Sequence, residues 1–145
     1  MNLQIINFYD KKTQINKDAF CIDRGGKNIQ PIVTWHSIPP AKCYALVMED
    51  PYSIYGNMVH WFVPVIYDNV CVKGLNSLNK FGYSGPCAPK NTGMRIYIFT
   101  LYSLDKIYNF DTSIQIKSSG DFEKILKNNG VKVLTKEMKS FYYDS

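Results

Sequence analysis

Residues 94–104 read MRIYIFTLYSL, and this stretch is the strongest indication of a β-strand in the chain. Isoleucine, tyrosine and phenylalanine dominate it, and these side chains fit the pleated surface of a sheet. Because side chains of a strand point to alternate faces, we expect Arg95, Tyr97 and Phe99 on one face. The stretch therefore predicts a strand that carries a guanidinium and a phenol side by side near its beginning.

Further strands are predicted on both sides of this stretch. The apolar run from Cys43 to Met48 is nearly continuous, which is typical of a strand covered on both faces, and Pro51 is expected to end it. Pro64 indicates an edge position or a bulge in its strand. The expected strands span residues 3–9, 31–36, 42–49, 58–67, 94–104 and 131–143.

One helix is predicted, late in the chain. Phe122, Ile125 and Leu126 are spaced to form one apolar face, Ser118 or Ser119 is the expected N-cap, and Gly130 stands where a helix would end. Strands followed by a late helix indicate a mostly β fold with two packed sheets and a peripheral helix. The length of 145 residues favours a single domain over residues 1–145.

Composition and charge exclude several classes of protein. Hydrophobic residues make up 46% of the chain, which excludes general disorder. The net charge is +5, but all but two of the 17 basic residues are scattered lysines, so we expect no nucleic-acid binding. No basic and apolar leader or membrane-length apolar run is visible, so we expect a cytoplasmic location without integral membrane association.

The four cysteines form no C-x-x-C pair. In a reducing cytoplasm we expect them to be free, with Cys43 and Cys71 as small buried side chains inside apolar runs. Metal binding by Cys87 together with His60 would lack further ligands, so no metal or other cofactor is predicted.

Three segments stand apart from ordinary core sequence. Asp50 shares its face with Leu46 and Met48, so its carboxylate is expected to point inward at the sheet rim, although a turn aspartate before proline is the simpler interpretation. His60 is expected on one face with Met58 and Phe62, where a satisfied core histidine is the alternative. Residues 80–97 form a loop rich in glycine and proline, which we expect to be ordered and to offer backbone N–H groups to an anion.

Several motifs resemble the phosphatidylethanolamine-binding protein family, which includes the Raf kinase inhibitor proteins. They are residues 26–31 with Trp35 and Pro39, the strand 45–51 with Asp50-Pro51, His60-Trp61, the loop 82–89 (GYSGPCAP), and Arg95-Ile96-Tyr97. The resemblance implies two antiparallel sheets packed together with one or two peripheral helices. It also implies a pocket for phosphate-like head groups and no robust catalytic activity. Carried over by position, the pocket residues are Asp50, His60, Gly85, Pro89 and Tyr97, and we add Pro86 and Arg95 beside them.

The chain departs from the family pattern in ways that change the charge of this pocket. The second aspartate of the D-P-D-A-P motif is absent from Asp50-Pro51-Tyr52-Ser53-Ile54, and Arg95 replaces a histidine. Arg95 is always ionised, so two outcomes are open. It could strengthen anion binding through bidentate contacts, or it could pair with Asp50 and fill the pocket.

Three functions are consistent with these features. The first is a non-enzymatic binding and regulatory protein for a phosphate or carboxylate group, carried by a phospholipid head group, another small ligand or a phosphorylated protein, with a kinase or other regulatory protein as partner. The second is a protein-interaction domain with a vestigial pocket, which would use the loop 52–57 and the tail 141–145. The third is a weak hydrolase with His60 as general base and Ser53, Ser84 or Cys87 as nucleophile.

Overall fold

The centre of the molecule is a four-stranded antiparallel sheet in the order β6-β5-β7-β8. The structure is a computed structural model that describes residues 1–10, 14–67 and 82–144. Its elements are β1 (Gln4–Ile6), β2 (Tyr9–Asp10), β3 (Gln14–Ile15), the 3-10 helices η1 (Lys17–Ala19) and η2 (Ile22–Arg24), β4 (Ile32–Thr34), β5 (Cys43–Ser53), β6 (Gly56–Ile66), β7 (Met94–Leu104), α1 (Ser119–Asn128) and β8 (Val133–Asp144).

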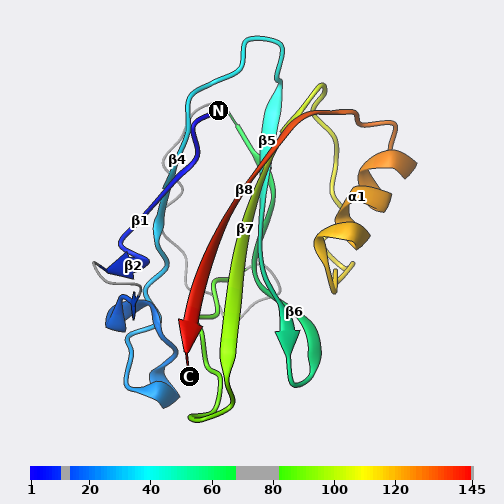
Figure 1. Ribbon diagram of the computed structural model, residues 1–145. Helices are drawn as coiled ribbons and strands as arrows, with labels where there is room; N and C mark the ends of the chain where they lie inside the picture. The colour runs from blue at the N-terminus through cyan, green and yellow to red at the C-terminus, as the bar shows by residue number, and fades with distance from the viewer. Residues whose placement is uncertain (11–13, 68–81, 145) are drawn as a thin grey trace.

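The central sheet is covered on both faces, as Figure 1 shows. The small antiparallel sheet of β1 and β4 packs on one face, and α1 covers the upper part of the other face. Two apolar clusters fill these interfaces, one containing Phe8, Trp61 and Phe99, and one containing Phe62 and Phe122. The expected mostly β architecture with two packed antiparallel sheets is therefore confirmed.

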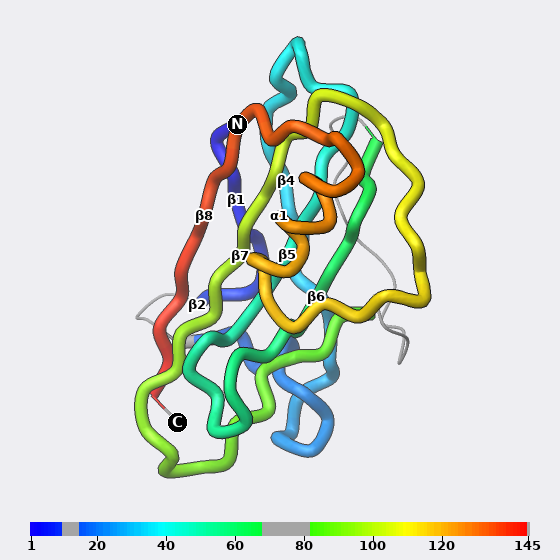
Figure 2. Tube along the Cα trace, turned by 90° about the vertical axis from the view of Figure 1, so that its right-hand side faces the viewer, coloured from blue at the N-terminus to red at the C-terminus, as the bar shows by residue number. Residues whose placement is uncertain are grey.

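The periodicity of the chain predicted most of these elements correctly. Figure 2 shows the long strands side by side, with β8 at one side of the sheet and the segment before α1 crossing back over its face. The predicted strand 3–9 is wrong as a single element, because Asn7 adopts a left-handed φ of 65° and separates β1 from β2. The Ser118 hydroxyl accepts from the Asp121 N–H at 3.1 Å, and Gly130 has a φ of 67°, so both expected ends of α1 are confirmed.

The prediction that Pro51 ends its strand is wrong. β5 continues to Ser53, although its pairing with β7 stops at Glu49. Beyond that point only β6 pairs with it, and the register shifts between Asp50 and Ser53. Pro51 therefore lies at an irregularity on the strand, where the missing N–H interrupts no ladder. As expected, Pro64 lies on an edge strand, at another shift in register.

Candidate functional site

The end of β5 and the beginning of β7 bring Asp50, Arg95 and Tyr97 together. Met48 pairs with Phe99 in the β5–β7 register, so Asp50 follows on the face that carries Tyr97 and Arg95. All three side chains are buried, with Asp50 only 2% and Arg95 only 4% exposed. The expected alternation of β7 and the inward direction of Asp50 are therefore confirmed.

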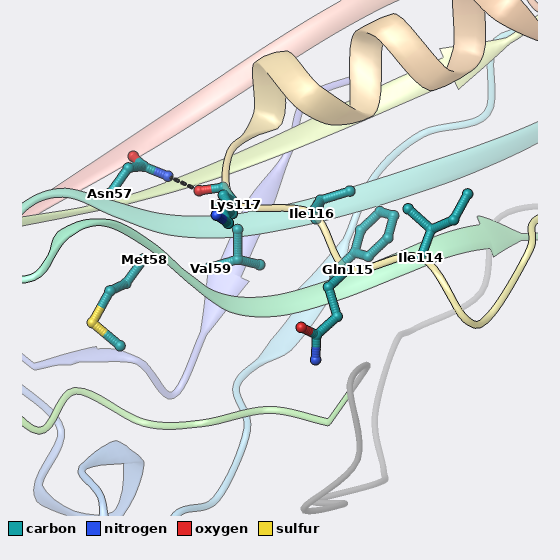
Figure 3. Close-up of a pocket in the computed structure, with 8 residues that line it drawn as sticks. Asn57, Met58, Val59, Ile114, Gln115, Ile116 and Lys117 are labelled. Carbon is teal, nitrogen blue, oxygen red and sulfur yellow. Dashed lines mark hydrogen bonds between the residues drawn. The ribbon is translucent and has the colours of Figure 1, made fainter.

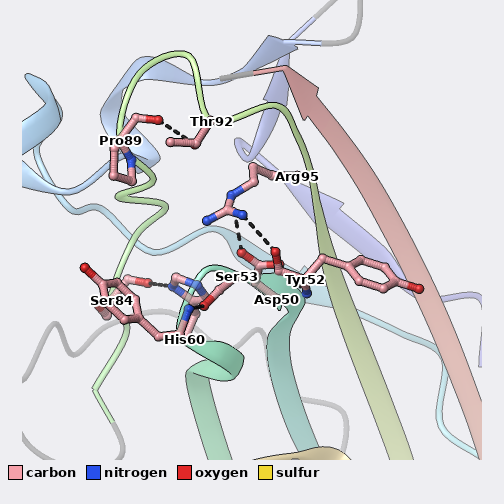
Figure 4. A network of polar contacts seen from close by, with 9 residues as sticks. Asp50, Tyr52, Ser53, His60, Ser84, Pro89, Thr92 and Arg95 are labelled. Carbon is pink, nitrogen blue, oxygen red and sulfur yellow. Dashed lines mark hydrogen bonds and ion pairs between the residues drawn. The ribbon is translucent and has the colours of Figure 1, made fainter.

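Arg95 folds toward Asp50 but does not form a close ion pair with it (Figure 4). Its Nε lies 3.8 Å from Asp50 Oδ2, which is too far for a hydrogen bond, and its Nη1 donates to the Tyr52 carbonyl at 2.8 Å. Asp50 Oδ1 accepts from the Tyr52 N–H at 3.0 Å. Among the described residues Arg95 Nε has no hydrogen-bond partner. One N–H donor of a buried guanidinium is therefore unused.

His60 reaches this site because of a bulge in β6. Glu49 pairs with Val59 and Met48 pairs with Trp61, so His60 is the extra residue between them. The prediction that His60 shares a face with Phe62 is wrong, since Phe62 packs in the α1 cluster and His60 packs edge-on against Tyr97, with ring centroids 5.4 Å apart. A bulge reverses the alternation of side chains, and it thereby turns His60 toward Tyr97.

The His60 ring is held in one tautomer. Its Nδ1 lies 2.8 Å from the Ser84 carbonyl oxygen, so Nδ1 carries the proton and donates. Burial lowers the pKa of His60 below its ordinary value of 6.5, and the Arg95 charge lowers it as well. The hydrogen bond to the Ser84 carbonyl and the charge of Asp50 raise this pKa, but they do not offset the effect of burial. The neutral ring therefore offers Nε2 as an acceptor, and His60 must be protonated before Nε2 can donate to an anion.

The loop that follows Gly82 is fixed to the segment 19–28 rather than open to a ligand. Gly85 N–H donates to Asn28 Oδ1 at 2.6 Å, and the Pro86 carbonyl accepts from the Cys21 N–H at 3.1 Å. A Cβ at Gly85 would lie 2.1 Å from the Ala19 carbonyl oxygen, so the close approach requires glycine. The expected anion nest is therefore not available at Gly85, whose N–H is already bonded.

Pro86 and Pro89, the other predicted site residues of this loop, occupy different environments. Pro86 is buried in the contact with the segment 19–28, whereas Pro89 is exposed. The Pro89 carbonyl accepts from the Thr92 hydroxyl at 2.7 Å, and both residues lie in the turn above Arg95 in Figure 4. The structure thus groups Asp50, His60, Arg95 and Tyr97 directly, with Gly85 and Pro86 as support and Pro89 at the exposed margin.

The expectation of free cysteines is wrong for two of them. Cys21 and Cys87 form a disulfide, with Cα atoms 5.4 Å apart and a sequence separation of 66. Neighbouring backbone bonds hold the two segments together, and this brings the thiols within bonding distance. Cys87 is therefore not available to bind a metal with His60. Cys43 is free and buried as expected, and Cys71 lies outside the described residues.

Other candidate sites in the described residues are distinct from this cluster. A cavity of about 270 Å³ lies between the start of β6 and residues 114–117, and the Asn57 side chain donates to the Lys117 carbonyl at its rim (Figure 3).

Within residues 1–10, 14–67 and 82–144, no group of three potential metal ligands lies together. None of the helices in this part of the chain is long and apolar enough to cross a membrane.

Sequence reasoning missed two residues that build the site. The Asn28 side chain donates through Nδ2 to the Tyr83 carbonyl and accepts at Oδ1 from the Gly85 N–H. The Tyr83 hydroxyl donates to the Ala19 carbonyl at 2.7 Å. Asn28 and Tyr83 both lie within the family motifs quoted above, and those motifs were the feature of the sequence that could have identified them. Arg24 was also missed; its Nε is buried without a hydrogen-bond partner among the described residues, and no motif marks it.

The chain resembles known proteins in both sequence and structure. The family model "Phosphatidylethanolamine-binding protein" matches residues 7–140. A UPF0098 protein of Aquifex aeolicus is 30% identical over 54% of this chain and 56% of its own length. LppC of Mycobacterium tuberculosis, whose name describes it as a provisional lipoprotein, is 40% identical over 54% of this chain and 45% of its own length. The chain thus spans about half the length of these curated relatives.

Solved structures share the fold over nearly the whole chain. E. coli YbcL, described as a member of the mammalian PEBP family, aligns with a TM-score of 0.73 and 18% identity over 100% of this chain and 99% of its own. A candidate phosphatidylethanolamine-binding protein homologue of Chlamydia trachomatis aligns with a TM-score of 0.65 and 22% identity over 99% and 97% of the two chains. These structural likenesses establish the fold, and the family model covers most of the sequence. The chain therefore belongs to the phosphatidylethanolamine-binding protein family.

Proposed function

We propose that this chain is a non-catalytic binding protein whose pocket of Asp50, His60, Arg95 and Tyr97 takes a phosphate-like or carboxylate group. The observation that carries the proposal is the buried guanidinium of Arg95, whose Nε has no hydrogen-bond partner among the described residues. Buried polar groups are nearly always satisfied, and a guanidinium matches the oxygens of phosphate and carboxylate. A small ligand, a phospholipid head group or a phosphorylated regulatory protein could present such a group.

The loose contact with Asp50 favours an anion over a filled pocket. A pair that closed the site would place Asp50 against the guanidinium in hydrogen-bonded geometry, whereas the observed separation is 3.8 Å. The carboxylate also has a competing partner in the Tyr52 N–H. Asp50 therefore orients Arg95 without satisfying it, and the Arg95 charge acts on both Tyr97 and His60.

Calorimetric titration with inorganic phosphate tests the proposal. We expect saturable binding to the wild type and at least a tenfold loss in Asp50→Asn/Arg95→Gln, because charge-assisted hydrogen bonds contribute about 1.5–3 kcal/mol each. The matched control is Glu123→Gln/Lys136→Gln, which removes an ion pair of 3.3 Å at the exposed edge of α1 with no change in net charge. Equal affinities of the two double variants would refute the pocket.

The affinity for sulfate should rise as the pH falls from 8 to 5. Sulfate keeps its charge over this range, so the change reports the protein. Protonation of His60 adds a positive charge and turns Nε2 into a donor, and its lowered pKa places the rise below about pH 6.5. We expect a gain of roughly tenfold in the wild type and a flat profile in His60→Gln. A flat wild-type profile would remove His60 from the pocket.

A second candidate is a protein-interaction domain, and the turn between β5 and β6 favours it. Tyr52 and Tyr55 are 66% and 80% exposed, and Ile54 and Met58 lie exposed beside them. Large exposed apolar patches mark interaction surfaces. In contrast, Phe141 of the predicted tail packs against the core and offers little free surface. If the wild type bound no phosphate or sulfate, this turn would become the leading candidate site.

The cellular compartment of the protein is also part of this proposal. The cytoplasmic location stays a prediction, and the Cys21–Cys87 disulfide argues for an oxidising compartment instead, because such bonds rarely persist in the cytoplasm. Binding rather than hydrolysis is proposed because Cys87, one of the candidate nucleophiles, is held in the disulfide.

A further inference from the structure

The two arginines of the chain, Arg24 and Arg95, share an uncommon property. In both, Nε is buried and has no hydrogen-bond partner among the described residues. Native proteins pair nearly all such groups, so an unsatisfied one calls for an explanation. Two buried Nε atoms without a partner therefore raise the question of whether the two arginines serve one site.

The fold brings the segment of Arg24 to the pocket. Phe20 packs edge-on against Tyr143 with ring centroids 5.2 Å apart, and Tyr143 is the register partner of Arg95 between β8 and β7. The disulfide of Cys21 and the bond from Cys21 N–H to the Pro86 carbonyl fix the chain there, and Arg24 ends the short helix η2 directly after Cys21. Arg24 is thus held beside the end of the sheet from which Arg95 projects.

The electrostatics of Tyr97 agree with this placement. Burial raises the pKa of the Tyr97 hydroxyl, and the Asp50 carboxylate raises it further. The positive charges of Arg95 and Arg24 both act in the opposite direction, so both guanidinium groups lie within electrostatic reach of one phenol. The charges of both arginines therefore act on one buried phenol, that of Tyr97.

The charges around Tyr97 do not balance. Within the described part of the chain, no carboxylate lies within 4 Å of the Arg24 side chain, whereas Arg95 shares Asp50 at 3.8 Å. With His60 neutral, two cations face one carboxylate. A monoanionic ligand would satisfy one guanidinium, whereas a dianion with three terminal oxygens could accept from both.

We infer that Arg24 is a second ligand-binding residue of the pocket, and that the two arginines select a phosphate monoester dianion over phosphodiesters and carboxylates. The inference rests on the proposed anion pocket and adds to it a residue and a preference. A phosphodiester carries one charge and a carboxylate has only two oxygens, so neither ligand can accept a full set of hydrogen bonds from both guanidinium groups. Arg24 would then determine specificity, while Arg95 would bind each of the three groups.

Titration of three phenyl ligands at pH 8 tests this inference. Phenyl phosphate is a dianion at this pH, methyl phenyl phosphate is a monoanionic diester, and benzoate is a carboxylate. We expect the wild type to bind phenyl phosphate at least about tenfold more tightly than the other two, and Arg24→Gln to lose about tenfold or more for phenyl phosphate alone. Arg24→Lys, which keeps the charge without the planar fork, should fall between them.

The matched control is Lys27→Gln, which removes the same charge from the same segment. The Lys27 side chain is 70% exposed and forms an ion pair with Asp18 across 3.9 Å, so its loss should leave the preference intact. Thermal unfolding of each variant verifies that it is folded. If wild type prefers phenyl phosphate but Arg24→Gln matches Lys27→Gln, the inference about Arg24 fails and the pocket stands. If the wild type binds none of the three ligands, both the inference and the proposed function fail.

Discussion

Replacement of both Cys21 and Cys87 by serine is expected to lower the free energy of unfolding by about 4 kcal/mol. The bond closes a loop of 66 positions, and the loss of loop-closure entropy in the unfolded chain predicts a stabilisation of this size. Such a loss is a large fraction of the 5–15 kcal/mol or so that stabilises a typical domain. Urea unfolding of the oxidised wild type and of the double variant measures it.

Reducing agent provides the internal control for this experiment. It should destabilise the wild type by a similar amount and leave the double variant unchanged, because the remaining cysteines take no part in the bond. Titration of free thiols in the unfolded, unreduced protein should find two of the four cysteines unreactive. Four reactive thiols, or an equal stability of the two proteins, would contradict the bond.

Substitution of Arg95 by alanine is expected to lower the free energy of unfolding by about 3–5 kcal/mol. The change leaves the Asp50 carboxylate, which is 2% exposed, without a neighbouring cation, and removal of one partner of a buried pair typically has this cost. The double variant Asp50→Asn/Arg95→Gln should lose much less, because no uncompensated charge stays buried. Chemical unfolding with two-state analysis measures each value.

A surface ion pair calibrates the size of this effect. Lys136 and Glu123 are each 39% exposed in their side chains, so Lys136→Ala should cost less than about 1 kcal/mol. If Arg95→Ala cost no more than Lys136→Ala, Asp50 would be well solvated in solution, and the pocket would be more open than the structure shows. The two substitutions remove the same charge, which makes them comparable.

The sequence predicted those parts of the site that follow from regular strand geometry. Arg95, Tyr97 and Phe99 share a face because the pairing of β7 with β8 is regular from Met94 to Ser103, and Asp50 follows Met48 by the same alternation. His60 was placed on the wrong face because a single bulge reverses parity, and a bulge leaves no reliable mark in a sequence read alone. Pro51 was misjudged for a related reason, since the strand continues where only one neighbour remains.

Contacts between distant segments were beyond the sequence. The Cys21–Cys87 bond depends on the packing of residues 19–28 against the loop after Gly82, which neither spacing nor composition reveals. Arg24 was missed for the same reason, because it lies in a 3-10 helix of three residues with no periodic pattern around it. Long-range placement of this kind is a property of the folded chain, whereas alternation along a strand is local.

The Cys21–Cys87 bond also governs what a protease can do to this protein. A single cut of the backbone anywhere between residues 21 and 87 would yield two fragments that stay covalently joined. These fragments would migrate together in a denaturing gel without reductant and separate once the bond is reduced. Such a cut would leave Arg24 and Pro86 tethered to each other, so a nicked molecule could keep its binding pocket.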